Sequence, residues 1–394
     1  MSKASQTPLA LYVHWPFCLS KCPYCDFNSH VAQTVDHDKW ADAMVRELRH
    51  HAARAQKQNH RLSSIFFGGG TPSLMAPETM AKIIAAAHDT FDGLDDIEIT
   101  MEANPTSVEA ERLKSFHDAG ANRLSMGIQS LKSDGLKYLG REHSAQEALK
   151  ALDHARQIFN RVSADFIYAR TDQTPNEWRD ELSDILALGL DHLSLYQLTL
   201  EPGTAFYSRH QRGLLTVPDA DEARRFYDLT QELTTAAGRP AYEISNHATP
   251  GQESRHNLIY WHAYDWLGIG PGAYGRFWVD GKRMETRSRR DPAAWLDDVM
   301  HQDHAIDQYT QDSMIDFAHE ALMMGMRLHQ GVHLNRITDM AGPLSTWGNE
   351  TAMDQLITAD FITMEDGYLR LTDQGRPLLN TILEHLTETP SSQG

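Results

Sequence analysis

Three cysteines, Cys18, Cys22 and Cys25, are the only thiols in the chain. Their C-x3-C-x2-C spacing directly follows an apolar run predicted to be a β-strand, so all three would project from one loop. Soft thiolates at such short spacing suit zinc or an iron–sulfur cluster. Zinc would need a fourth ligand, with His14 and His30 nearest. Three thiolates on a [4Fe–4S] cluster instead leave one iron open to the amino and carboxylate groups of a small molecule, and the spacing favours this cluster.

A run of three glycines ends the second apolar segment, within "FFGGGTPS" at residues 66–73. Without side chains, these residues allow close approach to the backbone, whose N–H and C=O groups can bind the polar end of an amino acid. A plain turn is the alternative for the run taken alone. No lysine follows as in a phosphate loop, and "GPGAYG" at 270–275 precedes no helical pattern, so we assign no nucleotide-phosphate or dinucleotide site.

The composition is that of a globular protein, with 41% hydrophobic and 23% charged residues. The formal charge of −18, from 54 acidic against 36 basic residues, argues against a nucleic-acid partner. Cysteines confined to one segment cannot form a disulfide framework, and 21 histidines keep a metal or heme ligand in view. No segment reaches the roughly 18 apolar residues of a membrane span, and the N-terminus has no apolar signal core. We therefore expect a cytoplasmic protein, with peripheral membrane contact left open.

The first half of the chain repeats one theme, a short apolar β-type run followed by an amphipathic helical pattern. The predicted strands lie near residues 9–15, 63–69, 96–102, 122–129, 163–168 and 192–199. The predicted helices lie near residues 36–57, 77–91, 107–118, 144–159, 175–188 and 219–237. Such β/α units in series predict an α/β fold with a parallel sheet and helices outside. Since a closed barrel needs eight units, we expect an open, partial (β/α)6 barrel with its chemistry at the carboxyl ends of the strands.

The sequence changes in character after the predicted barrel domain at residues 1–240. Residues 241–307 are rich in Gly, Pro, Tyr and Trp and are predicted to be loops that cap or extend the site. Residues 308–394 turn helical and end in a predicted strand, turn and closing helix at 367–386. This last region suits a smaller, mostly helical, winged-helix-like C-terminal domain. The acidic residues around it favour a packing role without DNA contact.

Several motifs in combination resemble one branch of the radical S-adenosylmethionine (SAM) proteins, which contains oxygen-independent coproporphyrinogen III oxidases and HemW-type heme chaperones. They are "YVHWPFCLSKCPYCDF" at 12–27, "GGGTPS" at 68–73, "EANP" at 102–105, "LSMGIQS" at 124–130, "SLYQLTLEPGT" at 194–204, "SRHNLIYW" at 254–261 and "GIGPGA" at 268–273. The resemblance spans residues 9–386. It implies a partial (β/α)6 radical SAM barrel, a [4Fe–4S] cluster, and SAM on the open iron of that cluster.

The resemblance implies a role for each matching position. The three cysteines would hold the cluster, and two tyrosines, before and inside their loop, match SAM contacts. The glycine run would receive the methionine amino group, two strand-end residues match ribose and carboxylate contacts, and an arginine would pair with the SAM carboxylate. In that order, the implied SAM contacts are Tyr12, Tyr24, Gly69, Gly70, Thr71, Glu102, Gln129 and Arg141, with Asp165 on the fifth strand completing the site.

Each polar residue of this set also has a structural explanation when taken alone. Glu102 could cap a helix, Arg141 could form a surface ion pair, and Asp165 could anchor a turn. It is their joint placement at the ends of predicted strands that favours the cofactor site.

Two features separate the branches of this family. The oxidases carry a further cysteine two places after the third, where this chain has Phe27, and a long segment before the first strand. Here the first strand is predicted to begin near residue 9, which leaves no room for such a lid. The chaperones also show HNxxYW, whose histidine, His256, is a candidate axial ligand for heme iron. A buried histidine bonded to loop backbone is the alternative.

The chain departs from the family pattern at two places. A Gly-Leu-Pro-Gly-Gln-Thr type loop is replaced by "ARTDQT" at 169–174, so both glycines are lost while Gln173 and Thr174 remain. Whatever close backbone contact those glycines allow is in doubt here. Tyr274 replaces a histidine that is common after "GIGPGA". Neither change touches the cluster ligands.

The leading hypothesis is a heme-binding radical SAM protein that carries heme to acceptor proteins and uses an electron donor for its cluster. One rival is an enzyme of porphyrin metabolism, the oxidative decarboxylase of coproporphyrinogen III. The other is a zinc-binding interaction protein. Product detection separates the first rival from a chaperone, and metal analysis separates the second.

Overall fold

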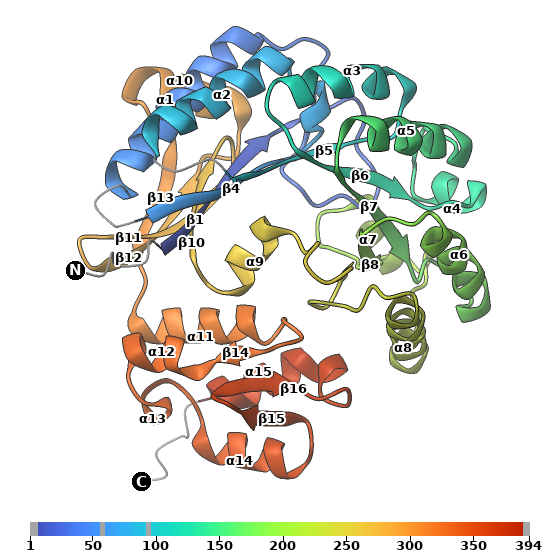
Figure 1. The fold of residues 1–394 in the computed structure, drawn as a ribbon, viewed down its shortest axis with the longest axis vertical. Helices are drawn as coiled ribbons and strands as arrows, with labels where there is room; N and C mark the ends of the chain where they lie inside the picture. The colour runs from blue at the N-terminus through green and yellow to red at the C-terminus, as the bar shows by residue number, and fades with distance from the viewer. Residues whose placement is uncertain (1–6, 56–59, 92–95, 389–394) are drawn as a thin grey trace.

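The computed structural model describes residues 7–55, 60–91 and 96–388. Within these residues, an 11-stranded sheet has the order β13-β12-β11-β10-β1-β4-β5-β6-β7-β8-β9. Figure 1 shows this sheet curving around an interior, with most helices on its outer side and a smaller domain against one end. The partial α/β barrel and the smaller C-terminal domain predicted from the sequence are confirmed.

The predicted β/α units form the central part of the sheet. Their parallel strands are β1 (Thr7–Trp15), β4 (His60–Gly69), β5 (Glu98–Ala103), β6 (Arg123–Gln129), β7 (Arg161–Tyr168) and β8 (His192–Gln197). Their helices are α1 (His37–Ala55), α2 (Pro77–Thr90), α3 (Ser107–Asp118), α5 (Ala145–Ile158), α6 (Pro175–Ala187) and α8 (Ala220–Ala236). The predicted first helix extends to residue 57, and its last two positions lie outside the described residues.

Local sequence explains why these units form. The strands are buried along most of their length. β1 is a nearly continuous apolar run, whereas β7 carries the polar Ser163 and Asp165 between apolar residues. The capping boxes Ser144–Glu147 and Thr174–Glu177 start helices α5 and α6, because each side chain satisfies backbone N–H groups of the first turn. Short elements between the units were not predicted, namely α4 (Ser133–Tyr138), α7 (Ala205–Gln211), η1 (Pro72–Leu74), β2 (Phe17–Cys18) and β3 (His30–Val31).

The interpretation of residues 241–307 as loops is wrong for most of this segment. It forms β9 (Asn246–Ala248), α9 (Arg255–Trp261), β10 (Asp265–Ile269), β11 (Tyr274–Val279), β12 (Lys282–Ser288), α10 (Pro292–Gln302) and β13 (Ile306–Gln311). β10 pairs in parallel with β1, and the others add antiparallel strands at both edges. Glycine misled the prediction: a Cβ at Gly268 would lie 2.0 Å from the Tyr274 carbonyl oxygen, so here glycine permits strand packing rather than a loop.

The C-terminal domain has its own apolar core. Its elements are α11 (Met314–Gly325), β14 (Val332–His333), α12 (Leu334–Ala341), α13 (Leu344–Trp347), α14 (Glu350–Thr358), β15 (Ile362–Glu365), β16 (Tyr368–Leu371), η2 (Arg376–Leu378) and α15 (Leu379–Thr387). The strands form a small antiparallel sheet in the order β14-β16-β15. Glu320 on α11 joins this domain to the barrel by ion pairs with Arg276 and Arg283. The exact domain boundaries stay a prediction, and β9–β13 share one sheet with the barrel strands.

None of the helices in the described part of the chain is both long and apolar enough to cross a membrane.

Candidate cofactor site

A cavity of about 480 Å³ lies at the carboxyl ends of the parallel strands, beside the cysteine loop. Because parallel strands end at the same edge of the sheet, residues far apart in sequence meet there. Of the residues given a cofactor role by resemblance, those lining the cavity are Cys18, Cys22, Cys25, Tyr24, Gly69, Gly70, Thr71, Glu102, Gln129, Arg141 and Asp165. Tyr12 and His256 do not line it.

The cysteine loop is held by its neighbours at several points. β2 and β3 pair in parallel, which brings the two ends of the loop together. Thr71 Oγ1 donates a hydrogen bond to Cys18 Sγ at 3.4 Å, and Arg141 Nη1 donates one to Cys22 Sγ at 3.5 Å. Burial raises the pKa of the Cys18 and Cys25 thiols. Donors aimed at sulfur favour the thiolate form that a metal cluster requires.

The donor set fits an iron–sulfur cluster better than zinc. Three cysteines line one cavity, yet no group of three or more His, Cys, Asp or Glu side chains in the described residues is placed to hold a single metal ion. A zinc ion needs all its sulfur ligands about 2.3 Å from one metal centre. In a [4Fe–4S] cluster each cysteine binds a different iron, so the sulfur atoms lie further apart. Of the histidines considered as a fourth zinc ligand, neither His14 nor His30 lines the cavity. Both ring nitrogens of His14 are already hydrogen-bonded.

The glycine run packs tightly against the cysteine loop. Gly69 has a φ of +113°, a left-handed conformation that favours glycine, and a Cβ at Gly70 would lie 2.7 Å from the Phe17 carbonyl oxygen. The N–H groups of Gly70 and Thr71 donate to the carbonyls of Trp15 and Phe17 at 2.7 and 2.8 Å. These N–H groups therefore hold the loop. The carbonyl oxygens of the run are the acceptors that the ammonium group of a ligand needs.

Arg141 connects the cysteine loop to the strand ends. Besides its bond to Cys22, its Nη2 donates to Asn104 Oδ1 at 2.5 Å and to the Gly127 carbonyl at 3.0 Å. Its Nε is buried and has no hydrogen-bond partner among the described residues. Arg141 is therefore no surface ion pair, and it offers a donor to an anionic ligand group.

Two carboxyl groups line the cavity from β5 and β7, the two strands that flank β6. Burial, reinforced by Asp165, raises the pKa of Glu102 to about 8, and burial also raises the pKa of Asp165. The Gly69 N–H donates to Glu102 Oε2 at 3.3 Å, and Ser125 Oγ donates to Asp165 Oδ1 at 3.2 Å. Neither carboxyl group has an ion pair within the described residues. Glu102 and Asp165 can accept hydrogen bonds from the hydroxyl groups of a ligand, or lie against a cationic ligand.

The two predicted tyrosine contacts lie in different places. Tyr24 lines the cavity, and its ring centroid lies 6.3 Å from that of Phe206. Tyr12 lies beneath the cavity, where its ring stacks on Phe66 and its hydroxyl lies 3.1 Å from His14 Nδ1. Tyr12 therefore supports the floor of the site in this structure rather than lining it.

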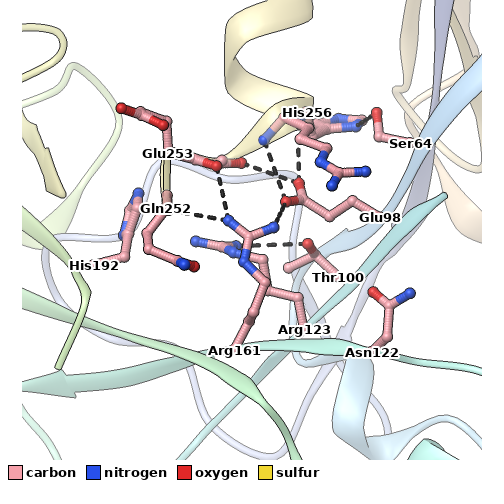
Figure 2. Close-up of polar contacts among 12 residues, drawn as sticks. Ser64, Glu98, Thr100, Asn122, Arg123, Arg161, His192, Gln252, Glu253 and His256 are labelled. Carbon is pink, nitrogen blue, oxygen red and sulfur yellow. Dashed lines mark hydrogen bonds and ion pairs between the residues drawn. The ribbon is translucent and has the colours of Figure 1, made fainter. Parts of the chain in front are cut away.

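The opposite, amino-terminal ends of the strands are closed by a buried network of charges, shown in Figure 2. Glu98, the first residue of β5, pairs with Arg161, the first residue of β7. Glu98 also accepts hydrogen bonds from the backbone N–H groups of Arg255 and His256 at 3.2 and 3.1 Å, at the start of α9. A carboxylate at a helix N-terminus is favourable, because it satisfies free N–H groups and the helix dipole. This network docks α9 against the base of the barrel.

His256 belongs to this base and is 1% exposed. Its Nδ1 lies 2.8 Å from Ser64 Oγ, and its Nε2 lies 2.8 Å from the Tyr260 hydroxyl (Figure 2 shows the Ser64 contact). Burial lowers the pKa of His256 to about 3, so the ring is neutral, with one donor and one acceptor nitrogen. Neither nitrogen is free for heme iron in this conformation. The heme-ligand role stays a prediction. The histidine is buried, as in the alternative, but its ring contacts are to side chains rather than to loop backbone.

Sequence reasoning gave no role to several residues that line the cavity. Asn104 follows β5 and accepts from Arg141 while donating to Thr71 at 3.4 Å. Ser125 orients Asp165, and the side chain of Tyr196, at the end of β8, is 43% exposed. All three lie within the quoted motifs: Asn104 just follows a predicted strand, and Ser125 and Tyr196 lie inside one.

The "ARTDQT" loop keeps a backbone that suits glycine although both glycines are absent. Ala169 and Asp172 have φ values of +56° and +61°. Such a conformation costs about 1–3 kcal/mol for a residue with a side chain, and somewhat less for Asp. Arg170 fixes the loop through a buried ion pair with Glu181, at 2.7 Å. None of these residues lines the cavity, so the departure leaves the cavity lining unchanged.

Comparison with protein families finds two matches in this chain. The model of the Radical SAM superfamily matches residues 12–185, and that of the HemN C-terminal domain matches residues 312–378. The first covers the cysteine loop and the strand ends around the cavity.

Several characterised relatives match over most of their length. "Heme chaperone HemW" of Escherichia coli (strain K12) is 36% identical, over 96% of this chain and 97% of the relative. "Heme chaperone HemW" of Bacillus subtilis (strain 168) is 30% identical, over 94% and 97%. "Radical S-adenosyl methionine domain-containing protein 1, mitochondrial" of Danio rerio is 35% identical, over 95% and 86%. The solved coproporphyrinogen III oxidase (HemN) from Escherichia coli has a TM-score of 0.80 at 21% identity, over 98% of this chain and 91% of that one, and shows the fold alone.

Proposed function

Because the chain belongs to the HemW family of radical SAM proteins, we propose that it is a heme chaperone, which binds heme and transfers it to acceptor proteins. We further propose that it carries a SAM-ligated [4Fe–4S] cluster in the 480 Å³ cavity. The observation that supports the cofactors best is the meeting, in this one cavity, of three cysteines with Arg141 and the Glu102–Asp165 pair.

Each part of the cavity has a task in this proposal. Cys18, Cys22 and Cys25 would hold three irons. The carbonyl oxygens of the glycine run would accept from the SAM amino group, and Arg141 Nε would donate to the SAM carboxylate. Glu102 and Asp165 would accept hydrogen bonds from ribose hydroxyls through their carboxyl oxygens, which retain acceptor capacity in either protonation state.

A reduced [4Fe–4S] cluster held by these cysteines would supply one electron for the reductive cleavage of SAM to methionine and a 5′-deoxyadenosyl radical. A protein electron donor is therefore part of the proposal. We assign that radical no role in heme transfer. In this proposal, the residues of the chain bind and orient the cofactors.

The rival proposal is that the protein is a coproporphyrinogen III oxidase. Phe27, which stands where those oxidases have a further cysteine, lies on the rim of the cavity and is 57% exposed. An apolar ring at this place cannot bind a metal, which favours the chaperone. The zinc-protein alternative is disfavoured by the lack of a single-ion site in the described residues.

Anaerobic reconstitution followed by parallel assays tests the proposal. Iron and sulfide analysis should give one [4Fe–4S] cluster per chain, hemin titration should give a saturable Soret band, and coproporphyrinogen III should not be converted. Clear conversion to protoporphyrinogen would overturn the chaperone reading. One zinc per chain without iron or sulfide would overturn the cluster.

The acceptor proteins and the cellular location are part of the proposal as well. The relatives named above include bacterial proteins and one described as mitochondrial. We keep the cytoplasm as the proposed location, without a nucleic-acid partner, and leave contact with a membrane surface open.

A further inference from the structure

A second cavity, of about 190 Å³, lies where the barrel meets the C-terminal domain. We call it the junction cavity. Its lining includes Trp261 at the end of α9, His262 and Tyr264 just after that helix, and His333, Arg336 and Tyr368 from the C-terminal domain. It therefore lies where the segment that follows α9 packs on the C-terminal domain, whose apolar core includes Ala263.

Arg336 is a half-buried cation without a carboxylate partner. Its guanidinium carbon stacks 3.8 Å from the centre of the Tyr264 ring, and Nη2 donates to the Ala263 carbonyl at 3.0 Å. Its Nε is buried and has no acceptor, and no ion pair to it exists among the described residues. Burying an unpaired charge is costly, and in a chain of formal charge −18 carboxylates are plentiful. The geometry therefore suits an anionic group that comes from a ligand.

His262 is an unattached imidazole on the same cavity. Its side chain makes no hydrogen bond within the described part of the chain, and the ring lies 6.0 Å from that of Tyr264. Burial, followed by the charge of Arg336, lowers the pKa of His262, so the imidazole is neutral near pH 7. A neutral imidazole with a free lone pair is the form that binds heme iron. His256, one turn and a half earlier, has both nitrogens occupied.

The other lining residues include aromatic side chains, one of which carries a hydrogen-bond donor suited to an anion. Tyr264, on which Arg336 stacks, and Tyr368, with Arg370 over its ring at 5.7 Å, supply aromatic surface, and the Trp261 indole Nε1 is a buried donor without an acceptor in the described residues. His333 differs from His262, because its Nδ1 already accepts from the Asn335 backbone N–H at 3.3 Å. The junction cavity thus combines aromatic walls, a cation and a free imidazole. These features suit a planar molecule that has carboxylates on its edge and a metal at its centre.

We propose that the junction cavity is where heme docks, with His262 as the iron ligand and Arg336 paired with a propionate. This proposal rests on the heme-chaperone function above and deepens it. Pockets that enclose a drug-sized ligand measure about 300–1,000 Å³. The smaller junction cavity would therefore seat one edge of the macrocycle and leave the other edge outside. A partly exposed cargo is what transfer to an acceptor protein requires.

Hemin titration of the full-length, cluster-reconstituted protein tests the site. We expect His262→Ala to weaken hemin binding at least tenfold and to shift the Soret band, and added imidazole to restore the wild-type spectrum. Arg336→Leu should weaken hemin binding about tenfold but leave the affinity for hemin dimethyl ester unchanged, because the ester has no free propionates. Arg336→Lys should recover part of the loss. His154→Ala, on an exposed face of α5, is the matched histidine control and should bind like the wild type.

The outcomes of this titration distinguish a wrong heme site from a wrong function. A wild-type protein that binds no hemin overturns the heme-chaperone proposal. A wild-type protein that binds hemin, with unchanged affinity and spectrum in both His262→Ala and Arg336→Leu, overturns the junction site and leaves the function standing. Loss of the Soret shift in His256→Ala but not in His262→Ala also overturns it. Circular dichroism and melting curves identify an unfolded variant, and His262→Gln then replaces His262→Ala in the same titration.

Discussion

Glu98 and Glu102 lie on the same strand, β5, and their surroundings are opposite. Burial alone would raise the pKa of Glu98, but Arg123, Arg161 and two backbone N–H groups outweigh it, so that its pKa is lowered. Burial and Asp165 act together on Glu102 and raise its pKa to about 8. One glutamate closes the amino-terminal base of the barrel, and the other faces the carboxyl-terminal cavity.

This comparison shows that the same strands carry a structural charge network at one end and the candidate cofactor site at the other. At the base, the charged groups pair with one another and with the first turn of α9, as Figure 2 shows. At the cavity, Glu102, Asp165 and Arg141 Nε keep bonding capacity that no described residue uses. Perturbed carboxyl groups in a cleft indicate a functional site, whereas a closed ion pair indicates structure. Five substitutions, one of them a control, test this distinction.

The largest expected effect is at the cavity. Cys22→Ser should prevent assembly of the cluster, because three thiolates are the minimum that leaves one iron for SAM. Iron and sulfide content should fall to near zero, and the reduced-state EPR signal should be lost. The melting temperature of the unreconstituted protein should stay within a few degrees of the wild type. A persisting EPR signal would show that the ligands are assigned incorrectly.

The largest expected effect on stability is at the base. Glu98→Gln leaves Arg161 and Arg123 without their carboxylate, and we expect a loss of about 3–5 kcal/mol in the free energy of unfolding. Since the lowered pKa of Glu98 contributes stability only above its unfolded value, near 4.3, the difference from the wild type should shrink as pH falls through the folded pKa. Denaturant titration at pH 7 and pH 4 measures both.

An exposed ion pair supplies the control for this change. Arg224 and Asp228 pair at 2.7 Å on the surface of α8, where water screens them. Asp228→Asn should change the unfolding free energy by less than about 0.5 kcal/mol. If Glu98→Gln were equally mild, the base would not be the closed structural network described above.

Glu102→Gln should have the opposite effect on the pH dependence of stability. The folded protein holds a proton on Glu102 that the unfolded chain releases, so the wild type loses stability as pH rises from about 4.3 toward 8. The variant lacks this loss, and its melting temperature should equal or exceed that of the wild type at pH 8. SAM affinity at pH 8, measured anaerobically by calorimetry, should fall roughly tenfold, because a charged acceptor is lost. Unchanged SAM affinity would remove Glu102 from the site.

The smallest effect concerns backbone strain beside the cavity. Ala169 has a φ of +56°, so Ala169→Gly should stabilise the protein by about 1 kcal/mol or less, since glycine adopts this conformation without a steric penalty. SAM affinity should not change, because residue 169 does not line the cavity. A marked loss of stability would show that the alanine methyl group contributes packing that outweighs the strain.

Much of the fold could be predicted because its causes are local. Apolar runs of the right length gave the parallel strands, and amphipathic patterns gave the helices that follow them. β10 was missed, since its glycines resemble a loop until their contact with Tyr274 is known. Asn104 was missed as a contact of Arg141, because an amide side chain has no spacing signal of its own.

The sequence alone determined the chemistry at the carboxyl ends, because the thiols, the glycine run and the strand-end acids each follow a recognisable strand, and parallel strands end together. Only the tertiary structure decided the rest. It put His256 in the closed base and His262 on the junction cavity, although both lie in one short segment. It also gave Glu98 and Glu102 opposite charge environments. The physical reason is that burial and pairing depend on neighbours distant in sequence, which no local pattern contains.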